Sequence, residues 1–238
     1  MDWMLERAIA HRGLHSGTVP ENSMGAFAAA IAQNYAIELD VQLLADGQVV
    51  VFHDTSLERM TGQTGAIAHH TIQTLQPLRL LGTDQHIPRL QEVLTLVNGQ
   101  VPVLIEIKNE GKAGALESAI LDLVSDYTGE FAIQSFNPYS LIWFKKHAPH
   151  IVRGQLSSNF RGVHLTWLMK IILANMLLNW ASTPHFIAYD VNALPNLATT
   201  IANRIFKRPL LAWTIRSQAD HQRALQYADN IIFDPFHR

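Results

Sequence analysis

The chain has 238 residues, of which 48% are hydrophobic and 16% are charged, so it can form one large or two small domains around a sizeable core. The formal net charge of −2 argues against a nucleic-acid-binding protein, which needs a basic face. The chain has no cysteine, which excludes disulfides, thiolate metal sites and a cysteine nucleophile. The N-terminus, MDWMLERAIAHRG, mixes acids with bases and has no apolar run, so we expect no signal peptide and a cytoplasmic location.

Short β-rich runs recur along the chain, and helical patterns separate most of them. This alternation indicates right-handed βαβ units and a parallel sheet. Eight such units form a TIM-type (β/α)8 barrel of typically about 250 residues, so we expect this α/β fold in a single domain over residues 1–238. Nine candidate strands for eight places imply that one is misassigned. The candidates are Ala8–His11, Ala36–Val41, Val49–His53, Val101–Lys108, Phe131–Phe136, Val152–Leu156, Phe186–Val191, Leu210–Thr214 and Asn230–Phe233, and the helical patterns cover residues 23–33, 114–127, 138–148, 197–206 and 218–228.

Two connections depart from this pattern. Residues 41–48 are too few for a helix, so the chain must return in extended form through the turn at Ala45–Gly47. Residues 55–88 are rich in Thr, Gln and Gly, which predicts a small insertion at the barrel rim, followed by a helix over 90–97.

The segment Val163–Trp180 is hydrophobic nearly all round. It is borderline for a membrane-spanning helix, which needs about 20 apolar residues, and it contains Lys170. We expect a barrel helix that is buried on its broad face. An alternative is peripheral membrane contact through residues 163–180, with Trp167 and Trp180 at the interface, and a spanning helix ranks third.

Polar residues gather where the candidate strands end, and the carboxyl ends of the strands form the functional face of a parallel barrel. Glu38 and Asp40 are two residues apart, so their side chains point to the same face of a strand. Glu106 and Lys108 share that relation. The other residues at strand ends are His11, Arg12, His53 and Gln134, and Trp213 lies on a later strand.

Carboxylates in otherwise apolar strands need compensation, because burial of a charge costs several kcal/mol unless it is paired or bound to a metal. Glu38, Asp40 and Glu106 would converge on one barrel mouth, and oxygen ligands are those that Mg²⁺ or Ca²⁺ prefers. We therefore predict one divalent cation. The alternative is a set of internal salt bridges with Arg12 and Lys108.

The cationic residues beside this cluster favour an anionic substrate. Arg12 offers a planar fork for phosphoryl oxygens and Lys108 a compact charge. His11 and His53 suit a general acid and a general base at neutral pH. The chain has no G-x-S-x-G, H-E-x-x-H, Walker or G-x-G-x-x-G motif, so phosphodiester hydrolysis on a metal-bearing barrel remains.

An ordered series of motifs resembles the glycerophosphodiester phosphodiesterase family. The series is HRG, PENS, IELDVQLLADGQVVVFHD, TSLERMTG, IPRLQEVL, LIEIK, QSF and AWT, and the resemblance extends from His11 to Asp234. It implies a TIM-type barrel with a small insertion. It also implies metal-dependent hydrolysis of glycerophosphodiesters to sn-glycerol 3-phosphate and an alcohol.

The resemblance also implies roles by position. His11 and His53 match the family's acid–base pair, Arg12 and Lys108 its phosphate contacts, and the three carboxylates its metal ligands. The pocket candidates are Glu21 and Asn22 of the PEN turn, Gln134 and Trp213, although Asn22 could simply cap the following helix and Trp213 could be a core residue. WTIR and NIIFDP depart from the family's pattern, which leaves the alcohol leaving group open.

Three rival functions stay open. The same site could act as a lysophospholipase D on single-chain lysophospholipids at a membrane surface. A metal-dependent sugar isomerase or aldolase is a weaker rival, since Lys108 would be its one candidate Schiff-base lysine. The chain could also be a non-catalytic protein that binds phosphodiesters or membranes. The sequence leaves the oligomeric state unassigned.

Overall fold

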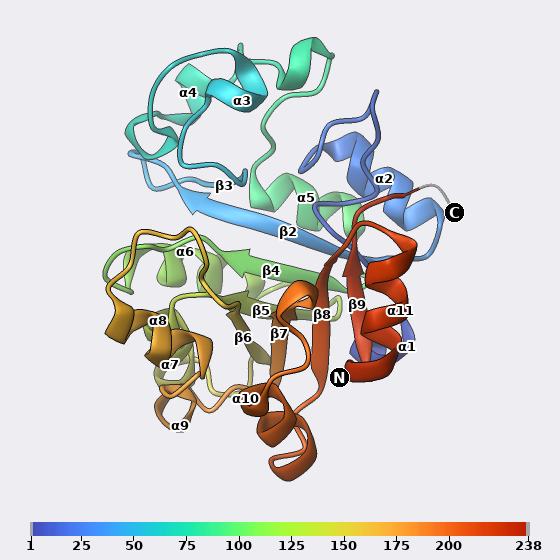
Figure 1. The fold of residues 1–238 in the computed structure, drawn as a ribbon. Coiled ribbons are helices and arrows are strands. Elements are labelled where there is room, and N and C mark those ends of the chain that lie inside the picture. The colour runs from blue at the N-terminus through green and yellow to red at the C-terminus, as the bar shows by residue number, and fades with distance from the viewer. Residues whose placement is uncertain (1, 237–238) are drawn as a thin grey trace. The chain divides into compact units, whose positions relative to one another are not determined.

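The computed structural model describes residues 2–236 and contains nine strands within that range (Figure 1). The strand order is β1-β9-β8-β7-β6-β5-β4-β2-β3, and β1 also pairs with β2. This is the order of a closed parallel barrel, so the predicted TIM-type fold is confirmed. The strands are β1 (Ile9–Ala10), β2 (Ala36–Leu43), β3 (Val49–Val51), β4 (Val103–Ile107), β5 (Phe131–Ser135), β6 (Arg153–Ser157), β7 (Phe186–Asp190), β8 (Leu210–Ile215) and β9 (Asn230–Phe233).

The expectation that one candidate strand is misassigned is wrong, because all nine are strands. The ninth is β3, which pairs antiparallel with β2 and is therefore additional to the eight parallel strands. The helices are α1 (Trp3–Glu6), α2 (Met24–Ala32), α3 (Glu58–Thr61), α4 (Ile72–Leu75), α5 (Leu90–Val97), α6 (Ala115–Val124), α7 (Pro138–His147), α8 (Trp167–Ala174), α9 (Asn179–Ser182), α10 (Leu197–Thr200) and α11 (Gln218–Tyr227).

The chain divides into two compact units, of which one is Ala10–Phe131. In this unit β2 pairs in parallel with β4, and the register sets Asp40 beside Glu106 and Glu38 beside Leu104. All five residues of β4 are buried, so the acidic residue on it is held among apolar neighbours. The strand pair therefore fixes where the carboxylates of the predicted metal site lie.

The insertion lies in the same unit and has a small core of its own. Residues 55–88 contain α3, α4 and two short 3₁₀ segments. Leu57, Met60, Ile67 and Leu75 are buried there against Phe52, which follows β3. Burial of each such side chain stabilises the fold by roughly 1.5–3 kcal/mol, so this core ties the insertion to β3.

The second unit contains the remaining described residues, including α7 to α11 and the parallel strands β6 to β9. Its core includes Ile187 and Tyr189 of β7 with Leu210 of β8. Gly154 of β6 lies opposite Phe186, and a Cβ atom at position 154 would collide with that aromatic ring. The glycine therefore allows β6 and β7 to pair around a fully buried phenylalanine.

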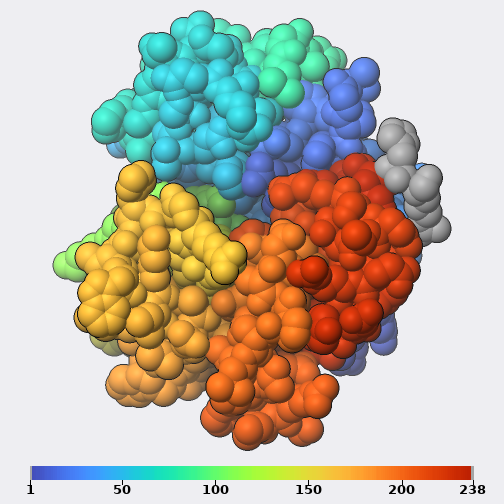
Figure 2. Space-filling model, in the orientation of Figure 1, coloured from blue at the N-terminus to red at the C-terminus, as the bar shows by residue number. Residues whose placement is uncertain are grey.

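The helix within residues 163–180 differs from the expected one. We expected burial on its broad face, but α8 has no buried residue, and Trp167 and Trp180 are 73% and 80% exposed. Figure 2 shows this segment, in yellow to orange, on the surface. Within the part of the chain that the structure describes, no helix combines the length and hydropathy that crossing a bilayer requires.

Candidate active site

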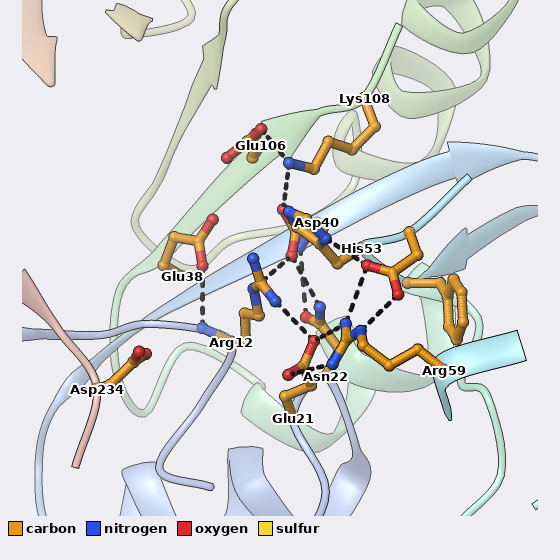
Figure 3. Close-up of polar contacts among 12 residues, drawn as sticks. Arg12, Glu21, Asn22, Glu38, Asp40, His53, Arg59, Glu106, Lys108 and Asp234 are labelled. Carbon is orange, nitrogen blue, oxygen red and sulfur yellow. Dashed lines mark hydrogen bonds and ion pairs between the residues drawn. The ribbon is translucent and has the colours of Figure 1, made fainter. Parts of the chain in front are cut away.

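The carboxylates of Glu38 and Asp40, inside β2, converge with that of Glu106, near the end of β4 (Figure 3). One oxygen from each residue lies within 4.8 Å of those from the other two, and all three residues are buried. A cation with ligand distances of about 2.0–2.6 Å holds oxygens no more than about 5 Å apart, so the spacing suits Mg²⁺ or Ca²⁺. The three residues could therefore hold one metal ion.

Glu38 gives the clearest sign of a missing partner. It is 1% exposed, and its Oε1 atom has no hydrogen-bond partner among the described residues. Its Oε2 atom accepts a 2.9 Å hydrogen bond from the main-chain N–H of Arg12. Burial raises the pKa of Glu38 well above its ordinary value, and the nearby charges of Asp40 and Glu106 add to this effect. A bound divalent cation would give Glu38 Oε1 a partner. Its positive charge would also favour the ionised carboxylate and so lower the pKa of Glu38.

The predicted salt bridges also form, and among the residues that the structure describes they involve Asp40 and Glu106 but not Glu38. Asp40 lies 3.3 Å from Arg12 Nε and 3.1 Å from Lys108 Nζ, and Lys108 Nζ lies 2.6 Å from Glu106 Oε1. Burial alone would raise the pKa of Asp40, yet Lys108 and other positive groups hold it below its ordinary value. Burial raises the pKa of Glu106 despite Lys108. Salt bridges and a metal ion are therefore compatible here.

The loop that contains the PEN motif forms a hydrogen bond with the carboxylate of Asp40. Asn22 Nδ2 donates a 2.8 Å hydrogen bond to Asp40 Oδ2. The suggestion that Asn22 caps the next helix is wrong, because Ser23 is the N-cap of α2 and accepts from Ala26 N–H. Both Arg12 and Asn22 have a positive φ, 56° and 53°. Such backbone costs about 1–3 kcal/mol per residue and is typical of functional sites.

A chain of charged hydrogen bonds connects the second histidine to this loop. His53 Nδ1 lies 2.7 Å from Asp54 Oδ1, and Arg59 donates to both Asp54 oxygens at 2.6 and 2.9 Å. Arg59 also donates to both oxygens of Glu21, one of which accepts from Arg12 Nη1 at 2.7 Å. Arg59 and His53 lower the pKa of Asp54 to about 2 against the effect of burial. Asp54 therefore orients an imidazole and is itself held ionised.

The two histidines lie within electrostatic range of Asp40, since both help to lower its pKa. Burial, with Lys108 and Arg12, lowers the pKa of His53, and Asp40 and Asp54 only partly oppose this shift. The lowered pKa favours the neutral form of His53, which can accept a proton. His11 is buried and directly precedes Arg12 after β1.

Arg59 was not singled out from the sequence, and Asp54 was not given a role. Asp54 follows His53 at a strand end, a signal that could have identified it. Arg59 meets Glu21 across 38 positions of sequence, so only the fold of the insertion reveals it.

The remaining two candidates lie in the other unit. Gln134 is buried on β5, and its Oε1 atom has no partner among the described residues. Trp213 lies on β8, where its ring meets Phe136 edge to face with centroids 5.5 Å apart. The indole Nε1 atom is also buried without a hydrogen bond in the described part of the chain. Each of the two strands therefore carries one buried polar side-chain atom to which no described residue forms a hydrogen bond.

Residues 11–235 match the family model described as the glycerophosphoryl diester phosphodiesterase family. The chain belongs to this family. A glycerophosphodiester phosphodiesterase of Caldanaerobacter subterraneus subsp. tengcongensis is 32% identical over 95% of this chain and 93% of its own length. The recognition made from the ordered motifs is thereby confirmed.

Solved structures agree with the fold of the glycerophosphoryl diester phosphodiesterase family. A phosphodiesterase of Oleispira antarctica in complex with the product sn-glycerol-3-phosphate aligns with a TM-score of 0.80 at 23% identity, covering 96% of this chain and 92% of its own. A glycerophosphodiester phosphodiesterase of Thermotoga maritima aligns with a TM-score of 0.75 at 25% identity, covering 96% and 94%. The expected enzyme class, glycerophosphodiester phosphodiesterase, is confirmed.

Proposed function

We propose that this chain hydrolyses glycerophosphodiesters to sn-glycerol 3-phosphate and an alcohol, with one divalent cation held by Glu38, Asp40 and Glu106. The observation that carries the proposal is the buried carboxylate trio with an unsatisfied Glu38 oxygen. The product named in the Oleispira antarctica complex supports the choice of substrate class. When bound, Mg²⁺ or Ca²⁺ would supply positive charge opposite a non-bridging phosphate oxygen.

Arg12 and Lys108 are the proposed phosphate contacts. Both already lie against Asp40, so their positive groups are held at the edge of the carboxylate cluster without the substrate. The negative neighbours raise the pKa of Lys108 despite its burial, and the ammonium stays charged. These two fixed cations orient the phosphodiester and stabilise charge that develops in the transition state.

His11 and His53 are the proposed acid–base pair. One histidine accepts the proton of the attacking hydroxyl as its oxygen bonds to phosphorus, and the other donates a proton to the departing alcohol oxygen. The lowered pKa of His53 favours this residue as the acceptor. The attacking hydroxyl can belong to water or to the 2-hydroxyl of the substrate's glycerol, which would first give a cyclic phosphate.

The test is release of sn-glycerol 3-phosphate from glycerophosphocholine and glycerophosphoethanolamine, first with EDTA and then with added Mg²⁺ or Ca²⁺. We expect EDTA to abolish release and one of the ions to restore it. Glu38→Gln should lower ion affinity by at least tenfold, whereas Glu130→Gln, at an exposed position, serves as the matched control. Full activity in EDTA after dialysis would contradict the metal-dependent reaction.

Lysophospholipase D activity is the second candidate, and the exposed apolar side chains of α8 favour it. Lysophosphatidylcholine would replace glycerophosphocholine in the same assay, with choline release as the measurement. Faster release from the lysolipid than from the deacylated substrate would make the lipid the preferred substrate. The reverse order would leave the first proposal in place.

A further inference from the structure

The second unit carries an apolar surface that the proposed reaction does not use. We call it the α8 surface. Exposed apolar patches of this kind mark interaction sites more often than isolated apolar residues do. The eight large side chains that form it are Val163, Leu165, Trp167, Leu168, Met169, Ile171, Leu177 and Trp180, each at least 36% exposed.

The α8 helix is fixed in place without burying these side chains. Ser157 at the end of β6 donates to the Leu173 carbonyl at 2.8 Å, and the Tyr189 hydroxyl of β7 donates to the Ala174 carbonyl at 3.0 Å. Thr166 caps the other end by accepting from Met169 N–H. Polar bonds to two strands thus hold the backbone while the apolar side chains stay in solvent. Their exposure is a property of an ordered element.

The stretch of chain that carries the α8 surface has side-chain charges of one sign. Residues 131–189 contain no Asp or Glu, although the chain as a whole has 20 acidic residues and a net charge of −2. The same stretch has basic side chains, among which Arg161 and Lys146 are exposed and Lys170 lies on α8 itself. Lys145 donates to the Ala181 carbonyl at 2.8 Å, which ties basic α7 to the end of α9. Local positive charge therefore adjoins the apolar side chains.

We propose that the α8 surface docks on an anionic lipid bilayer. Trp167 and Trp180 would enter the headgroup region, where tryptophan is favoured, and the basic residues would face the lipid phosphates. The helix is only eight residues long, so it would lie on the membrane and not cross it. The combination of two exposed tryptophans with an acid-free basic stretch favours an anionic lipid surface over a second copy of this chain.

Vesicle sedimentation of the full chain tests this proposal. Vesicles of phosphatidylcholine with about one third phosphatidylglycerol are compared with pure phosphatidylcholine, at low salt and at high salt. We expect at least tenfold stronger partitioning to the anionic vesicles, and a loss of binding at high salt. Equal partitioning to both kinds of vesicle, or no binding to either, would overturn the proposal.

Variants separate the two contributions. The pair Trp167→Ala and Trp180→Ala should lower partitioning at least tenfold, and Arg161→Glu with Lys170→Glu should do the same. Leu197→Ala with Leu225→Ala removes exposed apolar side chains elsewhere in the second unit and should bind as the wild type does. Circular dichroism verifies that each variant is folded. Wild-type partitioning of the tryptophan variant would refute the assignment, as would self-association in sedimentation velocity that requires these tryptophans and occurs without vesicle binding.

Discussion

Asp54 gives the second histidine its orientation. Its carboxylate bonds to His53 Nδ1 on one side and receives two hydrogen bonds from Arg59 on the other. A carboxylate bonded to one ring nitrogen fixes which nitrogen carries the proton, so Nε2 of His53 is left available for the proton transfer proposed above. A single ionised Asp54 thus determines both the direction and the tautomer of the imidazole.

We expect His53→Ala to reduce turnover by roughly 10² or more, because it removes the proposed proton acceptor. Asp54→Asn should reduce it by a smaller factor, roughly tenfold, because the imidazole remains but loses its fixed tautomer. Steady-state release of sn-glycerol 3-phosphate measures both. Asp126→Asn, at an exposed position, is the control. A larger loss in Asp54→Asn than in His53→Ala would contradict this order of roles.

The sequence predicted the positions of some site residues but not the contacts of others. Parity on one strand was enough to set Glu38 and Asp40 on the same face. The partner of Asn22 was not accessible in this way, because its contact with Asp40 depends on how the loop before α2 folds back. Sequence suggested only a local role for Asn22, as a helix cap, whereas the contact it makes is a long-range hydrogen bond that depends on the fold.

The connection from β1 to α2 is the element on which the site depends most. It carries His11, Arg12, Glu21 and Asn22, and it turns sharply at Gly13, which has a φ of 79°. A Cβ atom at Gly13 would lie 2.9 Å from the carbonyl carbon and the Cβ atom of Ala26 in α2. The close approach of this turn to α2 thus requires glycine.

Gly13→Ala should therefore destabilise the fold by about 1–3 kcal/mol, through strained backbone and a clash with α2. Urea unfolding measures the change. Gly17→Ala in the same connection is the matched control, since a Cβ atom there meets nothing within 4 Å and should leave the midpoint almost unchanged. Equal midpoints for the two variants would show that the turn can relax.

The sequence predicts most helices and strands, but it does not predict which of their faces are buried. The apolar pattern of residues 163–180 predicted a buried helix, and a shorter helix forms. Its periodicity was informative about local conformation, but burial depends on which elements cover it. Hydrogen bonds from Ser157 and Tyr189 hold the backbone of α8, while the other described elements leave most of its apolar side chains exposed.

For the molecule as a whole, the alternation of strands with helices predicted the barrel. It did not predict the place of β3, which pairs antiparallel with β2 as an additional strand, whereas one of the nine candidates was expected to be misassigned. The buried carboxylates make the stability of the folded state depend on pH. Burial raises the pKa of Glu38 and of Glu106, for which the ordinary value is 4.5. Without an ion, these groups stabilise the folded state most below that value, and this contribution is lost as pH rises through the raised pKa.

A divalent ion should reverse this dependence, because it binds the ionised carboxylates. We expect Mg²⁺ or Ca²⁺ to raise the unfolding temperature more at pH 8 than at pH 5, with about 2.7 kcal/mol of stabilisation at an ion concentration 100 times Kd. Thermal unfolding with and without the ion measures this increment. Glu38→Gln should remove most of it. An increment that is the same at both pH values would argue against a site that exchanges protons for an ion.

The main-chain hydrogen bond from Arg12 to Glu38 determines what a substitution at position 12 can remove. Every replacement of Arg12 except proline keeps the amide N–H, so the hydrogen bond to Glu38 Oε2 survives removal of the guanidinium. Position 12 thereby uncouples two tasks that one residue performs, since its guanidinium can be deleted while its backbone continues to hold a carboxylate of the trio. Glycine is the appropriate replacement, because it accepts the φ of 56° that other residues adopt at a cost.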